Sequence, residues 1–205
     1  MTQLPSTQPR DNLVTGSLPP QPSQPNQYIH YAALWGRRLD RVVELIGRAT
    51  AWLTLLLVLL VAFDVGARYL FHVSWVSEQE FEWHILAVIA LIAASYTLQQ
   101  GEHVRVDIFY QHYSERTKLW LDVVVPALIV IPIGLFIAYM SLHFVEMSYT
   151  INEGSPDPGG LPDRWLLKAF VPIGFALVAL QGLAMLLQAV VALCDYRQKG
   201  EEHGS

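Results

Sequence analysis

Four long apolar runs alternate with short polar segments and account for most of this 205-residue chain. A helix that crosses the hydrocarbon core of a bilayer needs about 20 mostly apolar residues. The third and fourth runs meet this length alone, and the first two meet it once their flanking residues are included. The pattern predicts an all-α, polytopic membrane protein whose four transmembrane helices lie at about residues 49–69, 81–99, 120–145 and 166–191.

The segments outside the spans are short. Residues 1–27 hold six of the twelve prolines together with many Gln, Ser and Thr residues. Such a segment cannot bury enough apolar surface to offset its ordering entropy, so we expect a disordered tail. The predicted organisation is this tail, a four-helix membrane domain at residues 28–192, and a cytoplasmic tail at residues 193–205.

Residues 28–48 are amphipathic. Apolar residues such as Trp35, Leu39 and Val43 recur at three- and four-residue spacing, while arginines and acidic residues occupy the other positions. An apolar stripe beside several arginines favours an interfacial helix that lies on the membrane surface. The alternative is a cytoplasmic extension of the first span.

The distribution of lysine and arginine predicts the orientation of the spans. Nine of these residues, or ten with Arg10, flank the spans on one side, and only three, Arg68, Arg164 and Lys168, lie on the other. Because positively charged loops stay in the cytoplasm, both termini are expected to be cytoplasmic. The loops on the external side are acidic.

The external loop at residues 152–163 reads NEGSPDPGGLPD. Its prolines fix φ and its two adjacent glycines permit positive φ, so the sequence predicts a tight, folded loop. Trp165 follows at the expected position of an interfacial aromatic residue, and Lys168 can extend its ammonium group towards the surface.

Ionisable residues are concentrated at the ends of the spans. Asp64 and Arg68 are four residues apart, which allows an ion pair along one helix face. Glu78, Glu80 and Glu82 open the second span, where the helix dipole favours acidic residues. We expect these groups to contact other helices or a partner subunit.

The sharpest alternative is a haem-bearing membrane anchor of a respiratory complex. His84 begins the second span and His143 ends the third, so both are predicted at similar depth and could ligate one haem. Interfacial hydrogen bonding is the simpler interpretation. No catalytic motif is present, and the single cysteine, Cys194, excludes an internal disulfide. We therefore expect no enzyme activity, cofactor or metal.

Several segments together resemble the small membrane subunit of tripartite ATP-independent periplasmic (TRAP) transporters, the DctQ-like family. The resemblance covers about residues 37–189. It rests on Arg68-Tyr69, on QEFEWH at residues 79–84, on HVRVD at residues 103–107, and on EGS, PGGLP, Arg164-Trp165 and Lys168 before the last span.

The resemblance implies a subunit of a sodium-coupled secondary transporter for organic acids in the bacterial inner membrane. It would pack against the stationary scaffold of the large permease subunit, among membrane lipids, and help to form the docking face for a periplasmic substrate-binding protein. No nucleic acid is implied. A transporter or channel that works without a second membrane subunit is a rival interpretation.

The expected contact residues follow from the same segments. The residues expected at helix or subunit interfaces are Arg68, Glu80, Glu82, His84, Arg105, Asp107, Arg164, Trp165 and Lys168. The expected docking loop contains Glu153, Ser155, Pro158, Gly159, Gly160, Leu161 and Pro162. Small residues such as Gly134, Gly174 and Ala184 are expected on the side that faces the large subunit.

Overall fold

The computed structural model describes residues 27–100 and 113–202, and within them the chain is almost entirely helical, without strands. The elements are α1 (Gln27–Phe71), α2 (Val76–Gln99), α4 (Glu115–Val125), the π-helical turn η1 (Pro126–Val130), α5 (Ile131–Thr150) and α6 (Trp165–Glu202). Four helical segments are long and apolar enough to cross a membrane, with α4, η1 and α5 forming one of them. The predicted fold class and number of spans are confirmed.

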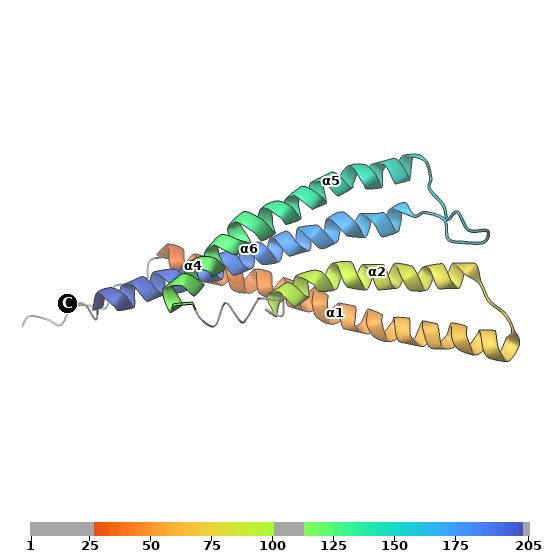
Figure 1. Cartoon of the computed structure of the whole chain (residues 1–205), viewed down its shortest axis with the longest axis horizontal. Helices are drawn as coiled ribbons and strands as arrows, with labels where there is room; N and C mark the ends of the chain where they lie inside the picture. The colour runs from red at the N-terminus through yellow and green to blue at the C-terminus, as the bar shows by residue number, and fades with distance from the viewer. Residues whose placement is uncertain (1–26, 101–112, 203–205) are drawn as a thin grey trace, which may run out of the picture.

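The helices lie side by side rather than in a closed bundle. Helix α6 packs against α5 on one side and α2 on the other, while α1 packs against α2 and crosses α6 (Figure 1). The start of α1 and the end of α6 lie together at what we call the terminal end. The α1–α2 and α5–α6 loops lie at the opposite end, the loop end. This arrangement leaves two broad helical faces uncovered.

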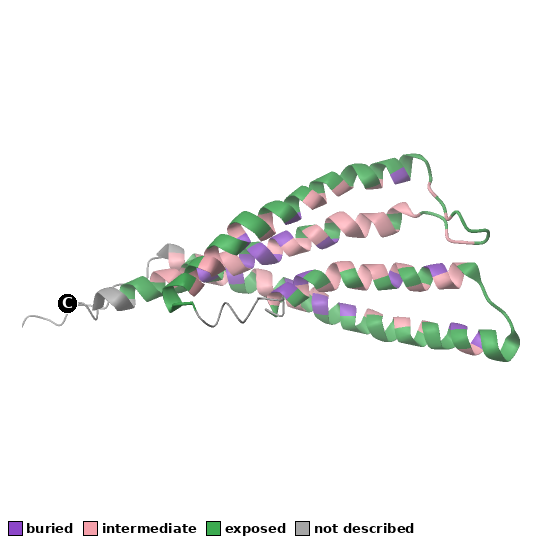
Figure 2. Ribbon diagram, viewed as in Figure 1, coloured by how far each residue is buried: buried purple, intermediate pink, exposed green. Residues whose placement is uncertain are grey.

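Few residues are buried, and large apolar side chains are exposed along all the helices (Figure 2). Small residues make the close contacts: a Cβ on Gly134 would lie 3.1 Å from Ala179, and one on Gly174 would lie 2.8 Å from the Leu91 carbonyl oxygen. Ala184 is fully buried. The prediction that these small residues face the large subunit is therefore wrong, because they are used for contacts between helices of this chain.

The amphipathic segment is helical, but it is not a separate helix. Helix α1 runs for 45 residues from Gln27 to Phe71 without a break. Val43 is fully buried, and a Cβ on Gly36 would lie 3.2 Å from the Gln188 side chain of α6. Part of the apolar stripe thus packs on this chain's own helices. The prediction of a separate surface helix is therefore wrong, and residues 28–48 extend the first span instead.

The prolines within the spans have different effects on their helices. At η1 the N–H of Ile131 donates to the carbonyl of Pro126, which is a five-residue step in place of the usual four. Pro132 follows directly and has no N–H to donate, so the hydrogen-bond pattern is disturbed at this point. Helix α6 continues past Pro172.

A polar cluster joins three helices near the terminal end. The carboxylate of Asp40 in α1 accepts hydrogen bonds from Gln181 Nε2, at 2.9 Å, and from Gln188 Nε2, both in α6. The backbone carbonyl of Asp40 accepts from Gln99 Nε2 of α2 at 2.7 Å. Because Gln181 is only 1% exposed, these bonds fix where α1 and α2 cross α6.

Candidate functional site

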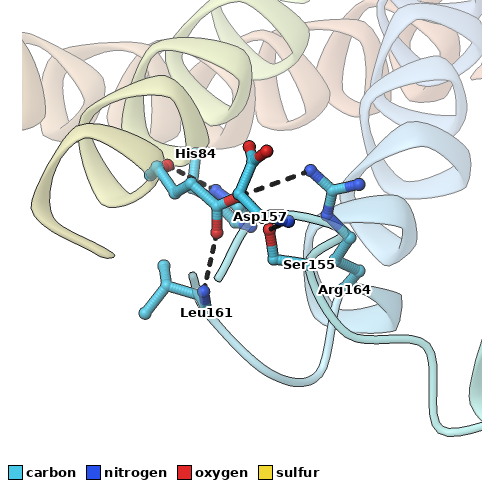
Figure 3. Close-up of polar contacts among 6 residues, drawn as sticks. His84, Ser155, Asp157, Leu161 and Arg164 are labelled. Atoms are coloured by element: carbon cyan, nitrogen blue, oxygen red, sulfur yellow. Dashed lines mark hydrogen bonds and ion pairs between the residues drawn. The ribbon is translucent and has the colours of Figure 1, made fainter. Parts of the chain in front are cut away.

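The loop end is organised around one buried carboxylate, that of Glu80 in the second turn of α2. Its side chain is only 4% exposed. The Leu161 backbone N–H donates to Glu80 Oε2 at 2.6 Å, and the Ser155 hydroxyl donates to Oε1. The Arg164 guanidinium lies 3.7 Å from Oε1 (Figure 3). A buried carboxylate is stable only with such donors, so Glu80 holds the α5–α6 loop against α2.

The loop has internal order that presents these donors. The Ser155 N–H donates to the Leu161 carbonyl at 3.0 Å, which closes the loop on itself. The Ser155 hydroxyl also accepts from the Asp157 N–H at 3.1 Å, and the Gly160 N–H donates to the Asp157 carbonyl. The tip of the loop is therefore held by its own backbone as well as by Glu80.

The two glycines of the loop have separate requirements. Gly159 has a φ of +83°, which side-chain-bearing residues rarely adopt. Gly160 has ordinary φ, but a Cβ there would lie 2.7 Å from Glu80 Oε2 and would also collide with Ser155. One glycine allows the turn and the other allows the close approach of the backbone to the carboxylate.

A second ion pair ties the base of the loop together. The Lys168 ammonium of α6 bonds to Glu153 Oε2, and the Arg164 N–H donates to the Glu153 carbonyl at 2.9 Å. The Lys168 ammonium beside it lowers the pKa of the Glu153 carboxyl below its usual value of 4.5. This pair connects the segment that leaves α5 with the first turn of α6.

Aromatic rings reinforce the same junction between α5 and α6. The rings of Tyr149 and Trp165 meet edge to face, with centroids 5.3 Å apart. The Lys168 ammonium lies 4.1 Å from the centre of the Phe144 ring, within the range of a cation–π contact. The loop end of α6 is thus fixed both to α5 and, through Glu80, to α2.

The remaining predicted contact residues that the structure describes are Arg68 in α1 and Glu82 and His84 in α2. Arg68 pairs with Asp64 four residues before it in α1, as their spacing predicted. His84 Nδ1 lies 2.5 Å from the backbone carbonyl of Glu80 in its own helix. Glu82 Oε1 in α2 is shielded from solvent and has no hydrogen-bond partner among the described residues.

The haem alternative receives no support from the positions of the two histidines. Helix α6 lies between α2, which carries His84, and α5, which carries His143 (Figure 1). The His143 side chain is 78% exposed and lies near Glu146 of its own helix. The two imidazoles therefore do not face one another across a common gap.

Some relevant residues were missed by the sequence interpretation, and others lie beyond the structure. Asp40 was assigned to the polar face of an amphipathic helix, although the two glutamines on the apolar α6 at residues 181 and 188 could have indicated a buried polar partner. Arg105 and Asp107 lie outside the described residues. Among the residues that the structure describes, no group of three or more His, Cys, Asp and Glu side chains is placed to hold a metal ion.

Residues 57–192 match the family described as "Tripartite ATP-independent periplasmic transporters, DctQ component". The match spans more than half of the chain, so the chain belongs to this family. Its members are transporter components and not enzymes: each is the small membrane subunit that works with a large permease and a substrate-binding protein. The chain is therefore a multi-pass membrane subunit of a TRAP transporter. Comparison with curated proteins and with solved structures gave no match.

Replacing Glu80 with alanine should release the loop without unfolding the helices. The Leu161 N–H and the Ser155 hydroxyl would lose their acceptor, and an unsatisfied buried group costs about 1–3 kcal/mol. Hydrogen exchange at the Leu161 amide should accelerate roughly 10- to 100-fold, since about 1.4 kcal/mol corresponds to a factor of ten. Glu78→Ala, two residues earlier in α2, is the control. Equal hydrogen-exchange protection of the loop in the two variants would contradict the role of Glu80.

The Glu153–Lys168 pair should make the stability of the loop end depend on pH. Because the pKa of Glu153 is lowered in the folded state, its contribution is present above the ordinary value of 4.5 and is lost as pH falls through the lowered pKa. The difference in thermal midpoint between the native chain and Lys168→Gln should therefore shrink on acidification. Arg48→Gln, which removes an exposed pair with Glu44, should show no comparable trend. A constant difference for Lys168→Gln would be incompatible with this assignment.

Proposed function

We propose that this chain is a stationary scaffold subunit of a sodium-coupled TRAP transporter for organic acids in a bacterial inner membrane. Its four spans pack against the fixed part of the large permease, and its α5–α6 loop contributes to the surface on which the periplasmic binding protein docks. The observation that carries the proposal is the open side-by-side arrangement of the helices in a member of the DctQ family.

The helix arrangement supports a scaffold role. A closed bundle would direct its apolar residues inward, but here large apolar side chains are exposed along every span, including Trp52, Phe63, Leu128 and Phe136. In a bilayer such surface is covered by lipid or by another membrane subunit. A broad layer of helices enlarges the lipid anchorage of whatever it joins, which would hold one part of a transporter still while another part moves.

The distribution of polar groups agrees with this role. The Asp40 cluster and the Glu80 cluster lie towards opposite ends of the helices, and each of them joins elements of this same chain. Their hydrogen bonds fix the relative positions of α1, α2 and α6. In the proposed division of labour, substrate and sodium cross the large subunit, and this chain supplies a fixed frame.

The α5–α6 loop is the proposed docking element. Its tip carries the exposed residues Asp157, Pro158 and Gly159, and its conformation is fixed by Glu80 rather than by contact with a partner. A preformed loop loses little entropy when a partner binds. Its acidic residues suit a basic patch on the binding protein, and such complementarity acts mainly on the rate of encounter.

The proposal requires the loop end to be periplasmic and both termini to be cytoplasmic. In the structure the start of α1 and the end of α6 lie at the same end, so a single orientation serves both (Figure 1). The excess of lysine and arginine around the terminal end favours the cytoplasm for that end.

Charge reversal at the loop tip tests the docking role. The complex of this chain with its large subunit would be placed in lipid nanodiscs and immobilised on a sensor surface. The association rate of the periplasmic protein would then be measured at several ionic strengths. Asp157→Lys should slow association, with the largest effect at low salt. Asp195→Lys changes the net charge equally at the terminal end and should leave association unchanged.

Two results would contradict the proposal. If Asp195→Lys slowed association as much as Asp157→Lys, the loop would not be the docking element. If the large subunit were isolated from the native membrane without this chain, and retained full transport after its deletion, the scaffold role itself would be excluded.

A further inference from the structure

A hollow of about 550 Å³ lies along α2 on one side of the helix layer. Most of its lining comes from α2 and α6, Leu53 of α1 also lines it, and Leu161 and Pro162 of the α5–α6 loop close it at the loop end. Helix α2 lies between α1 and α6 and packs against both (Figure 1). The hollow is therefore a trough with α2 as its floor and α1 and α6 as its sides, and we call it the α2 trough.

The floor of the α2 trough has the residue spacing of a surface that receives another helix. Four apolar residues of α2 line it at intervals of four, three and four positions, so they form a single seam along one face of the helix. These residues are Phe81, Ile85, Val88 and Ile92. At 1.5 Å per residue the seam is about 16 Å long. The polar lining residues are His84 and Asp163, so the lining is otherwise apolar and fits an apolar transmembrane segment.

A second hollow, of about 560 Å³, opens on the same side of α6. It lies between α5 and α6, and its lining includes the contacting rings of Tyr149 and Trp165. Leu166 lines the α2 trough and Ile173 lines the second hollow. They are seven residues apart and thus share one face of α6, where their side chains are 52% and 48% exposed. The two hollows and the α6 ridge between them form one surface, which we call the hollow face.

The opposite side of α2 has a different shape. Trp83 follows Phe81 by two residues, so it points about 200° away around the helix. Trp83 is 67% exposed, Leu86 on the same side is 54% exposed, and neither lines the α2 trough. Lipid tails are as apolar as these protruding side chains and cover them without a shaped partner. Shape therefore distinguishes the two faces of the layer.

We propose that the hollow face binds a transmembrane helix of the large permease, which lies in the α2 trough, and that the Trp83 side of α2 faces lipid. An α-helix is about 10–12 Å across and packs at about 8–10 Å from its neighbours, which suits a trough with one helix as its floor and two as its sides. This inference rests on the proposed scaffold role, because it names the surface through which this chain joins the large permease.

The position of the α2 trough favours the large permease over a second copy of this chain or a lipid tail. Leu161 and Pro162, which close the trough, belong to the loop proposed to dock the periplasmic protein. A permease helix in the trough would therefore lie directly beside the docked binding protein. The docking surface and the permease contact would then be continuous, as transfer of a molecule from one to the other requires.

Photo-crosslinking in the nanodisc complex of the full chain with its large permease tests the proposal. A photoreactive phenylalanine analogue would replace Phe81 in one variant and Trp83 in another. The two positions are aromatic, exposed and two residues apart on α2, so the second is a matched control. The Phe81 variant should form a covalent adduct with a transmembrane helix of the large permease. The Trp83 variant should react with lipid instead.

Filling the α2 trough provides a second measurement. Val88→Trp adds volume to the floor and should weaken binding of the large permease roughly tenfold or more. Leu86→Trp adds volume on the other side of α2 and should leave binding unchanged. The thermal midpoint of each variant alone is the folding control, and if Val88→Trp lowers it, the crosslinks alone decide.

The outcomes separate this inference from the scaffold role. Permease adducts from Trp83 alone, or equally from both positions, would overturn the choice of face while the scaffold role stands. Adducts of the Phe81 variant with lipid only, or with a second copy of this chain, would also overturn the inference. If the large permease does not associate with this chain at all, the scaffold role is wrong and the inference is wrong with it.

Discussion

The shape of the loop end depends on a single requirement: the Glu80 carboxylate is buried and must have donors. The loop supplies them as one backbone N–H, one hydroxyl and a nearby guanidinium. The glycine that lets the backbone approach and the glycine that lets it turn are consequences of the same requirement. Glu80 holds α2 to the α5–α6 loop and to the start of α6. The Glu153–Lys168 pair connects the end of α5 to the same group of elements.

That local rigidity matters because the helices themselves are poorly enclosed. A layer of helices with lipid on its faces gains little from a hydrophobic core, since lipid tails are as apolar as the side chains they touch. The tertiary structure is therefore stabilised by close contacts between helices at small residues and by buried hydrogen bonds. The Asp40 cluster does this near the terminal end and the Glu80 cluster does it at the loop end. In the proposed scaffold role, a subunit built in this way would present fixed surfaces to its partners and would need no site of its own for the transported molecule.

The sequence predicted the spans because the hydrocarbon core demands length and apolarity, and these can be counted residue by residue. It also predicted the Asp64–Arg68 pair, because four-residue spacing in one helix is local information. Glu80 was among the expected contact residues, but its partners Ser155 and Leu161 follow it by 75 and 81 positions. Those contacts depend on the packing of α6 against α2, and no local sequence pattern encodes that packing.

The residues whose roles were predicted wrongly also show that local sequence patterns do not identify the contact partner. Gly134 and Gly174 were predicted to face the large subunit, but composition cannot tell a contact within the chain from one with another subunit. The amphipathic pattern of residues 28–48 was real, yet the same stripe fits a membrane surface or the side of α6. Asp64 Oδ1 and Glu82 Oε1 have no hydrogen-bond partner among the described residues, which no sequence pattern could indicate.

The central claim is that the α5–α6 loop and α2 form one rigid face, held by Glu80. It is tested most directly by the distance between spin labels at Val76→Cys and Gly154→Cys, in a chain whose single native cysteine is replaced by Cys194→Ser. A Cβ at Gly154 meets no other atom within 4 Å, so a label fits there. In the nanodisc complex the distribution of label-to-label distances should be narrow, and the binding protein should leave it unchanged. Adding Glu80→Ala should broaden it. A broad distribution in the parent chain, or one that Glu80→Ala leaves narrow, would contradict the account.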